Sequence, residues 1–174
     1  PEAREKMHNA STMAGMAFAN AFLGMSHSMA HKIGAVHHTV HGRTNAILLP
    51  YVIRYNGTRP SKTTTWPKYN YWKADEKFQD IARMLGLPHS TPEEAVEAYA
   101  KAVYELGVAV GIKMNFKDQG IDEKAWKDSL HEIALLAYED QCSPANPRLP
   151  MVADMEEIMA DAYYGYAERP GRRK

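Results

Sequence analysis

The sequence predicts an all-α protein, a bundle of six helices with short connections. Two observations support this fold class. First, apolar residues at helical spacing or helix-start signals occur in segments that together cover most of the 174 residues. Second, no two segments form a convincing pair of strands. Residues 51–55 alone could form a strand, but no partner strand is present elsewhere in the sequence. We therefore expect a single helical domain.

The first predicted helix spans residues 2–33, where Ala, Met and Leu dominate and no proline intervenes. Its stretch from residue 12 to residue 23 is apolar on nearly every face, which predicts a buried helix. This stretch is too short to span a bilayer. Gly34 is the predicted stop, and residues 35–41 are expected to form a turn.

Residues 44–55 form the second predicted helix, which Pro50 is expected to kink. The segment that follows, residues 56–73, contains glycine and two prolines and is predicted to be a loop. Solvated linkers are poor in aromatic residues. We therefore expect this loop to pack on the body of the protein through its aromatic side chains, Trp66, Tyr69, Tyr71 and Trp72.

Local signals place the remaining four helices. A helix at residues 74–85 has one apolar face and is closed by Gly86. The pair Thr91-Pro92, followed by two glutamates, opens a helix that continues to about residue 110. The last two predicted helices cover residues 122–139 and 151–164, and the basic tail at 166–174 is expected to fray. The inner face of the helix at 122–139 is expected to carry Trp126, Leu130, Ile133 and Leu136.

Charge and composition exclude several classes of protein. Lys plus Arg and Asp plus Glu both total 21, so the net charge is zero, whereas a nucleic-acid-binding protein needs a basic surface. The only cysteine is Cys142, which rules out a disulfide within the chain and favours a reducing, cytoplasmic location. No apolar run reaches membrane-spanning length. The chain begins at Pro1, directly in helix-forming sequence, and we expect it to be part of a longer protein.

Histidine is concentrated near the start of the chain, where six of the eight histidines fall within the first 41 residues. His27 and His31 are four residues apart, so on a helix they share one face. His41 follows a predicted turn and can fold back toward them. Imidazole binds zinc, iron, copper or nickel, and a neutral imidazole can also relay protons. The alternative is a set of histidines that are satisfied in the core or exposed at the surface.

The metal interpretation is incomplete from the sequence alone. A structural zinc site needs four ligands, and a catalytic site usually has three with an open position. No Asp or Glu lies near these histidines in the sequence, so a carboxylate ligand would come from elsewhere. Cys142 has no base beside it and is expected to be a buried structural thiol. Methionine, also concentrated in the first 41 residues, is expected to fill the core.

Residues 15–34, the pair His41-Gly42 and residues 45–50 together resemble the iron-containing (group III) alcohol dehydrogenases, whose metal signature is His-x3-His-x9-His-Gly. Residues 138–150 and 162–165 are similar to the C-terminal end of the bifunctional aldehyde–alcohol dehydrogenases of that family. The resemblance covers essentially the whole chain. It implies that residues 1–174 are the all-α metal-binding domain, incomplete on its N-terminal side, which follows an α/β nucleotide-binding domain.

The resemblance also implies a function and site residues. The expected activity is interconversion of acetaldehyde and ethanol by hydride transfer, with NAD and with Fe²⁺, or Zn²⁺ as the alternative. His27 and His41 correspond to two metal ligands, and an Asp and a His on an upstream helix would supply the others. His31 corresponds to a position near the nicotinamide, with a proton-relay or cofactor-orienting role. Val40 stands where the family commonly has Pro, and His37 stands where an aromatic residue is expected.

Three functions therefore stay open. In the first, the chain is the helical part of this dehydrogenase, inactive without the upstream domain and part of a homo-oligomer or filament, with no nucleic acid or membrane as partner. In the second, the isolated chain is a non-catalytic oligomerisation or filament module. In the third, it is a free-standing metal-binding bundle in which a carboxylate such as Asp75 or Glu76 completes the site.

Overall fold

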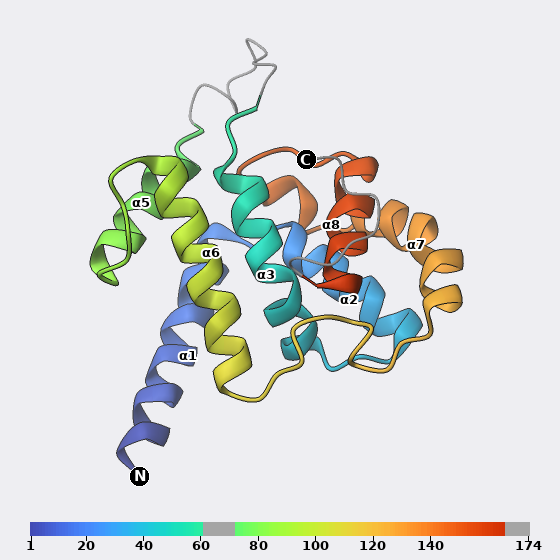
Figure 1. The fold of residues 1–174 in the computed structure, drawn as a ribbon, viewed down its shortest axis with the longest axis horizontal. Coiled ribbons are helices and arrows are strands. Elements are labelled where there is room, and N and C mark those ends of the chain that lie inside the picture. Colours follow the sequence, from blue (N-terminus) through green and yellow to red (C-terminus); the bar gives the residue numbers. More distant parts are fainter. Residues whose placement is uncertain (61–71, 166–174) are drawn as a thin grey trace.

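The computed structural model describes residues 1–60 and 72–165 (Figure 1). Within these residues there is no β-strand, which confirms the all-α class. None of the helices in these two ranges is long and apolar enough to cross a membrane. The helices are α1 (Glu2–Ala21), α2 (Met25–His37), α3 (His41–Gly57), α5 (Ala74–Met84), α6 (Pro92–Ala109), α7 (Glu123–Tyr138) and α8 (Val152–Tyr164), with a single 3₁₀ turn, η1 (Ser143–Ala145).

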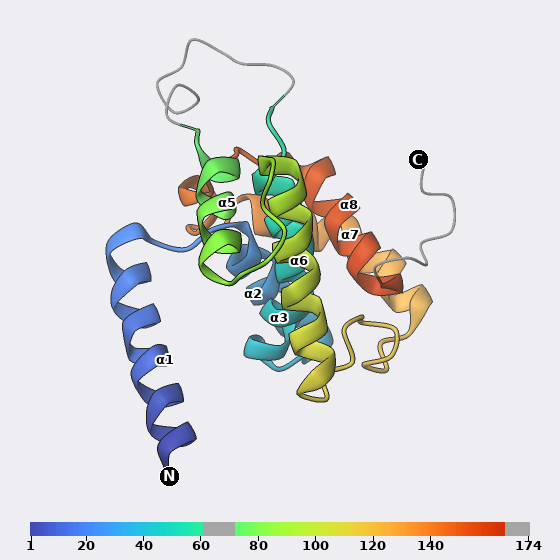
Figure 2. The same ribbon diagram turned by 60° about the vertical axis from the view of Figure 1, so that its left-hand side comes forward.

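Helices α2 and α3 lie at the centre of the bundle (Figures 1 and 2). Helix α3 packs against α2, α5, α6 and α8, while α2 also contacts α7, α8 and η1. The two central helices are therefore held from several sides. Since α2 carries two of the candidate site histidines and α3 begins with the third, the best-supported part of the fold positions the site.

The core follows the helical period of α2. Met25, Met29 and Ile33, spaced four residues apart, are fully buried against the other helices. Their buried neighbours in this cluster include Ile47 and Leu48 of α3, Trp126 and Ile133 of α7, and Met155, Met159 and Tyr163 of α8. The expectation that methionine fills the core is thus correct for α2, and burial of this face fixes the rotation of the helix.

The predicted helix at residues 2–33 is two helices. Phe22 has a φ of 63° and ends α1, and α2 begins after Gly24. At this break, the backbone N–H of Met25 donates to Oδ1 of the buried Asn146 side chain at 3.2 Å. A β-carbon on Gly24 would lie only 2.7 Å from that same oxygen. The break is therefore fixed by a residue distant in sequence, which local propensity does not reveal.

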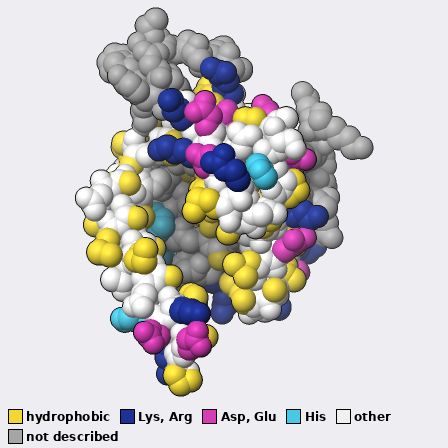
Figure 3. Space-filling model, turned by 90° about the vertical axis from the view of Figure 1, so that its left-hand side faces the viewer, with side chains coloured by type: hydrophobic (Ala, Val, Ile, Leu, Met, Phe, Trp, Pro, Cys, Tyr) yellow, Lys and Arg dark blue, Asp and Glu magenta, His cyan; other side chains and the backbone are white. Residues whose placement is uncertain are grey.

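Helix α1 also differs from the prediction that its apolar stretch is buried. None of its residues is buried, and Met13, Met16 and Phe18 are exposed. It stands beside the bundle (Figure 2), and the space-filling view shows a hollow between them with a histidine side chain visible inside it (Figure 3). The pattern correctly indicates a helix that needs apolar partners. Residues 1–60 and 72–165 do not supply them.

The ends of α2 and α3 also shift relative to the prediction. Gly34 lies inside α2, which continues to His37 and ends at His38, whose φ of 54° supplies the left-handed conformation. Helix α3 begins at His41 rather than residue 44 and continues through Pro50 to Gly57. The turn between the two helices is therefore shorter than expected, which keeps His41 close to α2.

The C-terminal half agrees better with the sequence. The Thr91 hydroxyl accepts from the N–H of Glu94 at the start of α6, and the Asp122 carboxylate caps α7 through the N–H of Ala125. Leu136 is 40% exposed, so its placement on the inner face of α7 was wrong. Trp72 packs as expected, donating from Nε1 to the carbonyl of Asn56. Trp66, Tyr69, Tyr71 and the tail at 166–174 lie outside the described residues.

Candidate metal centre

The structure brings together the three histidines singled out from the sequence. His27 and His31 project from the same face of α2, and His41 is the first residue of α3. The ring centroids of His27 and His41 are 5.3 Å apart, those of His31 and His41 are 5.3 Å apart, and those of His27 and His31 are 6.1 Å apart. His27 and His31 are half-buried and His41 is exposed. The trio therefore forms one cluster that is open to solvent on one side.

This spacing fits a shared metal ion. Two imidazoles that bind one tetrahedral ion through bonds of about 2 Å have ring centroids roughly 5 Å apart. The separation of His27 and His41 is close to that value, and the two rings are tilted by 54°. The rings of His31 and His41 are nearly parallel, at 16°. The spacing alone does not distinguish which two of the three rings are ligands.

The protonation state of His27 also suits metal binding. Burial lowers its pKa, and the neighbouring His41 and His31 lower it further because each disfavours a second positive charge. A lowered pKa keeps the imidazole neutral at pH 7, and only a neutral ring offers a lone pair to a metal. The donor set of this cluster is thus chemically suited to a divalent cation.

Asn45 links the two helices that carry the cluster. Its amide nitrogen lies 3.1 Å from Nε2 of His41, and its carbonyl oxygen accepts from the hydroxyl of Ser26 at 2.9 Å. An amide nitrogen only donates, so Nε2 of His41 is the acceptor and its proton lies on Nδ1. This chain of polar contacts ties the start of α3 to the first turn of α2.

A carboxylate that the sequence did not indicate reaches the cluster. Asp140 follows α7, and its Oδ2 lies 3.3 Å from Nδ1 of His31 and 2.9 Å from Nζ of Lys32. The two residues suggested for this task, Asp75 and Glu76, lie instead in the first turn of α5. A signal in the sequence was weak: Asp140 stands two residues before Cys142, in a loop that carries three prolines.

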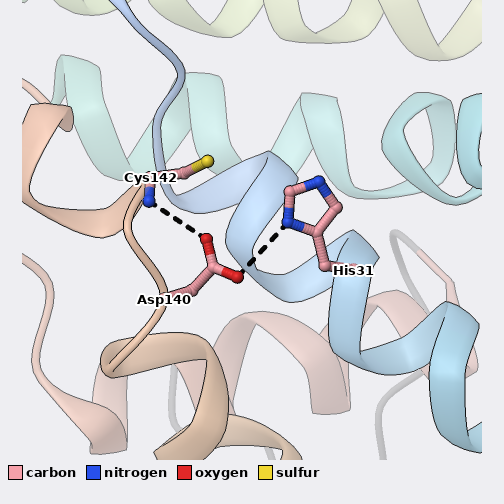
Figure 4. A group of neighbouring side chains, drawn as sticks. All are labelled: His31, Asp140 and Cys142. Atoms are coloured by element: carbon pink, nitrogen blue, oxygen red, sulfur yellow. Dashed lines mark hydrogen bonds and ion pairs between the residues drawn. The ribbon is translucent and has the colours of Figure 1, made fainter.

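His31, Asp140 and Cys142 form a group whose ligand atoms lie within 4.8 Å of one another (Figure 4). Its charges do not favour a second cation. The ammonium of Lys32 already neutralises the Asp140 carboxylate. Burial raises the pKa of the Cys142 thiol to about 11, with the adjacent Asp140 adding to the effect, so the thiol stays protonated. The group is a hydrogen-bonded network, and Cys142 is the buried structural thiol predicted from the sequence.

His37 and His38 lie apart from the trio. Nε2 of His37 is 3.0 Å from the hydroxyl of Ser129, and its ring contacts Trp126 of the core. His38 provides the positive φ that ends α2. Both line a cavity of about 290 Å³ between the start of α3 and the loop before α7. These two histidines have structural roles, which removes the concern that all five form one polar turn.

Comparison with known proteins identifies the class that this fold and cluster define. Residues 1–163 match the Fe-containing alcohol dehydrogenase family, C-terminal part. Since this match covers almost the whole chain, the chain belongs to that family. The resemblance stated from the sequence is thereby confirmed.

Individual relatives narrow the class further. The aldehyde-alcohol dehydrogenase of Streptococcus pneumoniae serotype 2 (strain D39) is 82% identical over 171 residues, which are 98% of this chain and 19% of that protein. The bifunctional aldehyde-alcohol dehydrogenase of Escherichia coli K12 is 39% identical over 168 residues, 95% of this chain and 19% of that protein. The NADPH-dependent butanol dehydrogenase of Clostridium saccharobutylicum is 42% identical, over 94% of this chain and 39% of that enzyme.

Solved structures agree with the sequence relatives. A 1,3-propanediol oxidoreductase matches 93% of this chain with a TM-score of 0.78 and 34% identity, and the match covers 38% of that enzyme. The alcohol dehydrogenase of Oenococcus oeni gives the same TM-score with 33% identity. The chain thus spans about a fifth of its aldehyde–alcohol dehydrogenase relatives and about two fifths of the smaller dehydrogenases.

Proposed function

We propose that this chain is the helical part of a metal-dependent alcohol dehydrogenase that interconverts acetaldehyde and ethanol, within a bifunctional aldehyde–alcohol dehydrogenase. The observation that carries the proposal is the convergence of three imidazole rings at the junction of α2 and α3. Membership of the family and 82% identity to an aldehyde-alcohol dehydrogenase support it.

His27 and His41 are the proposed metal ligands, and His31 is the proposed catalytic and cofactor-orienting residue. A bound divalent ion would polarise the alcohol or aldehyde oxygen, while a nicotinamide cofactor exchanges the hydride. The chain's own contribution is positional. Burial of one face of α2 holds His27 and His31 in place, and the neutral state of His27 keeps its lone pair available. We expect iron, with zinc as the alternative, because imidazole and carboxylate ligands suit both.

NAD is the proposed nicotinamide cofactor. The butanol dehydrogenase relative is described as NADPH-dependent, so the choice between the two cofactors varies among proteins that are similar to this chain. That choice depends on groups that contact the 2′ position of the adenosine ribose, which the proposed upstream nucleotide-binding domain would supply. The cofactor preference is therefore a test of that domain, whereas the metal site is a test of this one.

The exposed apolar surface of α1 supports the proposal of an upstream domain. Met13, Met16 and Phe18 expose apolar area that water disfavours. The hollow between α1 and the bundle is the proposed place where an upstream helix packs and brings the remaining two metal ligands (Figure 3). We propose a cytoplasmic enzyme on the same grounds as its fermentative relatives and its single, protonated thiol.

A chimeric enzyme tests the proposed function. This chain replaces the matching 171 residues of the Streptococcus pneumoniae enzyme, and the purified chimera is assayed for bound metal and for ethanol-dependent reduction of NAD. We expect stoichiometric iron or zinc and activity. In the variants His27→Ala and His41→Ala, metal affinity should fall by more than about 100-fold, since outer-shell partners alone are worth about 10–100-fold. The exposed His89→Ala is the matched control and should keep metal and activity. An active His41→Ala variant with full metal content would refute the ligand assignment.

Assembly is a second candidate function of this domain, favoured by the same exposed helix. If α1 instead mediates contact between copies, Phe18→Glu should reduce the mass of the assembled chimera and leave the activity of each subunit intact. Sedimentation of the chimera and its Phe18→Glu variant separates the two. If α1 packs on the upstream domain, as proposed first, the variant should lose stability and activity without a defined smaller assembly.

A further inference from the structure

The side chain of Asp140 is held by three donors in a site that is 7% exposed. The backbone N–H of Cys142 donates to Oδ1 at 3.0 Å. Nζ of Lys32 and Nδ1 of His31 both approach Oδ2, at 2.9 and 3.3 Å. Figure 4 shows the carboxylate between the Cys142 backbone and the His31 ring. The carboxylate therefore has a fixed orientation relative to the imidazole.

The charge of Asp140 determines where the proton of His31 lies. Burial raises the pKa of this carboxyl, but the bonds from Cys142, Lys32 and His31 outweigh that effect and lower the pKa to about 2. At neutral pH the group is an ionised carboxylate, which accepts hydrogen bonds only. Nδ1 of His31 is then the protonated nitrogen. In Figure 4 the other ring nitrogen points away from Asp140, with its lone pair free.

We propose that Asp140 is a positioning residue that fixes the ring orientation and the tautomer of His31, so that Nε2 is presented as an acceptor at the catalytic cluster. This inference rests on the proposed dehydrogenase function. A carboxylate bound to one imidazole nitrogen is a general means of holding the ring and raising the basicity of the other nitrogen. Nε2 of His31 can then accept a proton or a hydrogen bond from a hydroxyl group of the substrate or cofactor.

The surrounding loop does not need Asp140 for its shape. The hydroxyl of Ser143 donates to the carbonyl of Ala137 at 2.6 Å and lies 3.0 Å from the hydroxyl of Ser28. Asn146 anchors the next part of the same loop to Met25. Lys32 binds the same oxygen as His31 and so stabilises the charge that orients the ring. The contact with His31 is thus separable from the contacts that hold the loop.

The test uses Asp140→Asn in the chimeric enzyme. Asparagine has the same shape and keeps an oxygen for the N–H of Cys142, but it presents an amide donor to Nδ1 of His31. We expect kcat for ethanol oxidation to fall by about 10–100-fold, in the range of general acid–base effects, with KM for ethanol changed by less than about threefold. Metal content should be unchanged. Ser143→Ala, in the same loop, is the control and should keep kcat within about twofold.

A double-mutant comparison distinguishes positioning from a structural role. In a His31→Ala background, Asp140→Asn should cause almost no further loss of kcat, because the group it acts through is gone. A crystal structure of the Asp140→Asn chimera should show a rotated or displaced His31 ring. If that variant is not recovered folded, Asp140→Ser serves in the same comparison. An undiminished loss in the His31→Ala background, or an unmoved ring with unchanged kcat, would overturn the proposal. Absence of metal and activity in the unaltered chimera would instead refute the proposed function.

Discussion

Oδ1 of Asn146 accepts the backbone N–H of Met25 at 3.2 Å and joins two segments 121 residues apart. The first N–H groups of a helix lack partners within the helix, and a side-chain acceptor stabilises them. Asn146 thus acts as a long-range cap for α2, the helix that carries His27 and His31. The loop after α7 supports the candidate site at both ends, through Asn146 at the start of α2 and through Asp140 one turn further along.

Asn146→Ala is expected to destabilise the start of α2 by about 2–4 kcal/mol, because it leaves buried donors unpaired. Besides capping Met25, the Asn146 amide nitrogen donates to Oδ1 of Asn56 at 2.7 Å and to the carbonyl of Arg148 at 2.6 Å. Hydrogen exchange of the chimera, followed by mass spectrometry, measures the effect on the opening of individual segments. Peptides from α2 should lose protection. Those from α6, which has no contact with Asn146, are the internal control, and equal loss in both would contradict a local cap.

Gly24→Ala tests the same junction from the other side. Gly24 has an extended backbone that alanine adopts without strain, so the cost comes from the β-carbon 2.7 Å from Oδ1 of Asn146. We expect a loss of about 1–3 kcal/mol at the start of α2, in the range of overpacking effects. Gly42→Ala, whose β-carbon would meet no atom within 4 Å, is the control. In an Asn146→Ala background the cost should shrink, and a fully additive cost would show that the clash lies elsewhere.

The junction also explains which parts of the fold were predictable. The starts of α6 and α7 were predicted correctly because their caps, Thr91 and Asp122, lie within three residues of the N–H groups they accept. The break before α2 was missed because its cap is Asn146. Helix α1 was expected to be buried because periodicity reports apolar character and not which polypeptide covers it. Fold class therefore follows from local patterns, while the boundaries set by distant side chains do not.

The candidate site divides in the same way. His27 and His31 could be paired from their spacing, since helix geometry places residues four apart on one face. His41 was placed nearby because the chain must turn, and the ring centroids 5.3 Å apart agree with that expectation. Asp140 could not be found this way, because it lies 109 residues from His31 and no local pattern relates them. Its contribution depends on the packing of α7 against α2.

Arg148 is predicted to hold the end of α3 against the loop after α7. Its guanidinium lies over the ring of Tyr55, 4.1 Å from the centroid, and Nη1 donates to the carbonyls of Tyr55 and Thr58 at 3.1 and 3.3 Å. Positive charge at the C-terminal end of a helix is favourable. Arg148→Ala should cost about 2 kcal/mol, and Arg148→Lys about half of that, because lysine keeps the charge but not the planar group. Protection of peptides from the end of α3 measures both. Equal loss in the two variants would contradict a role for the stacked guanidinium.

Stability of the loop around Asp140 is expected to depend on pH. The pKa of Asp140 is lowered from 3.8 to about 2 in the folded protein, where Cys142, Lys32 and His31 outweigh the opposing effect of burial. A carboxyl group with a depressed pKa stabilises the folded state above its unfolded pKa, and this contribution is lost as the pH falls from about 4 to 2. A shift of this size corresponds to about 2 kcal/mol, of which about half is lost by pH 3. Hydrogen exchange of peptides spanning residues 138–150, corrected for intrinsic rates, should therefore show a smaller opening free energy at pH 3 than at pH 5. Asp140→Asn removes the titrating group, so its loop should respond to pH less by about 1 kcal/mol. The same pH response in both proteins would assign the effect to another acidic group.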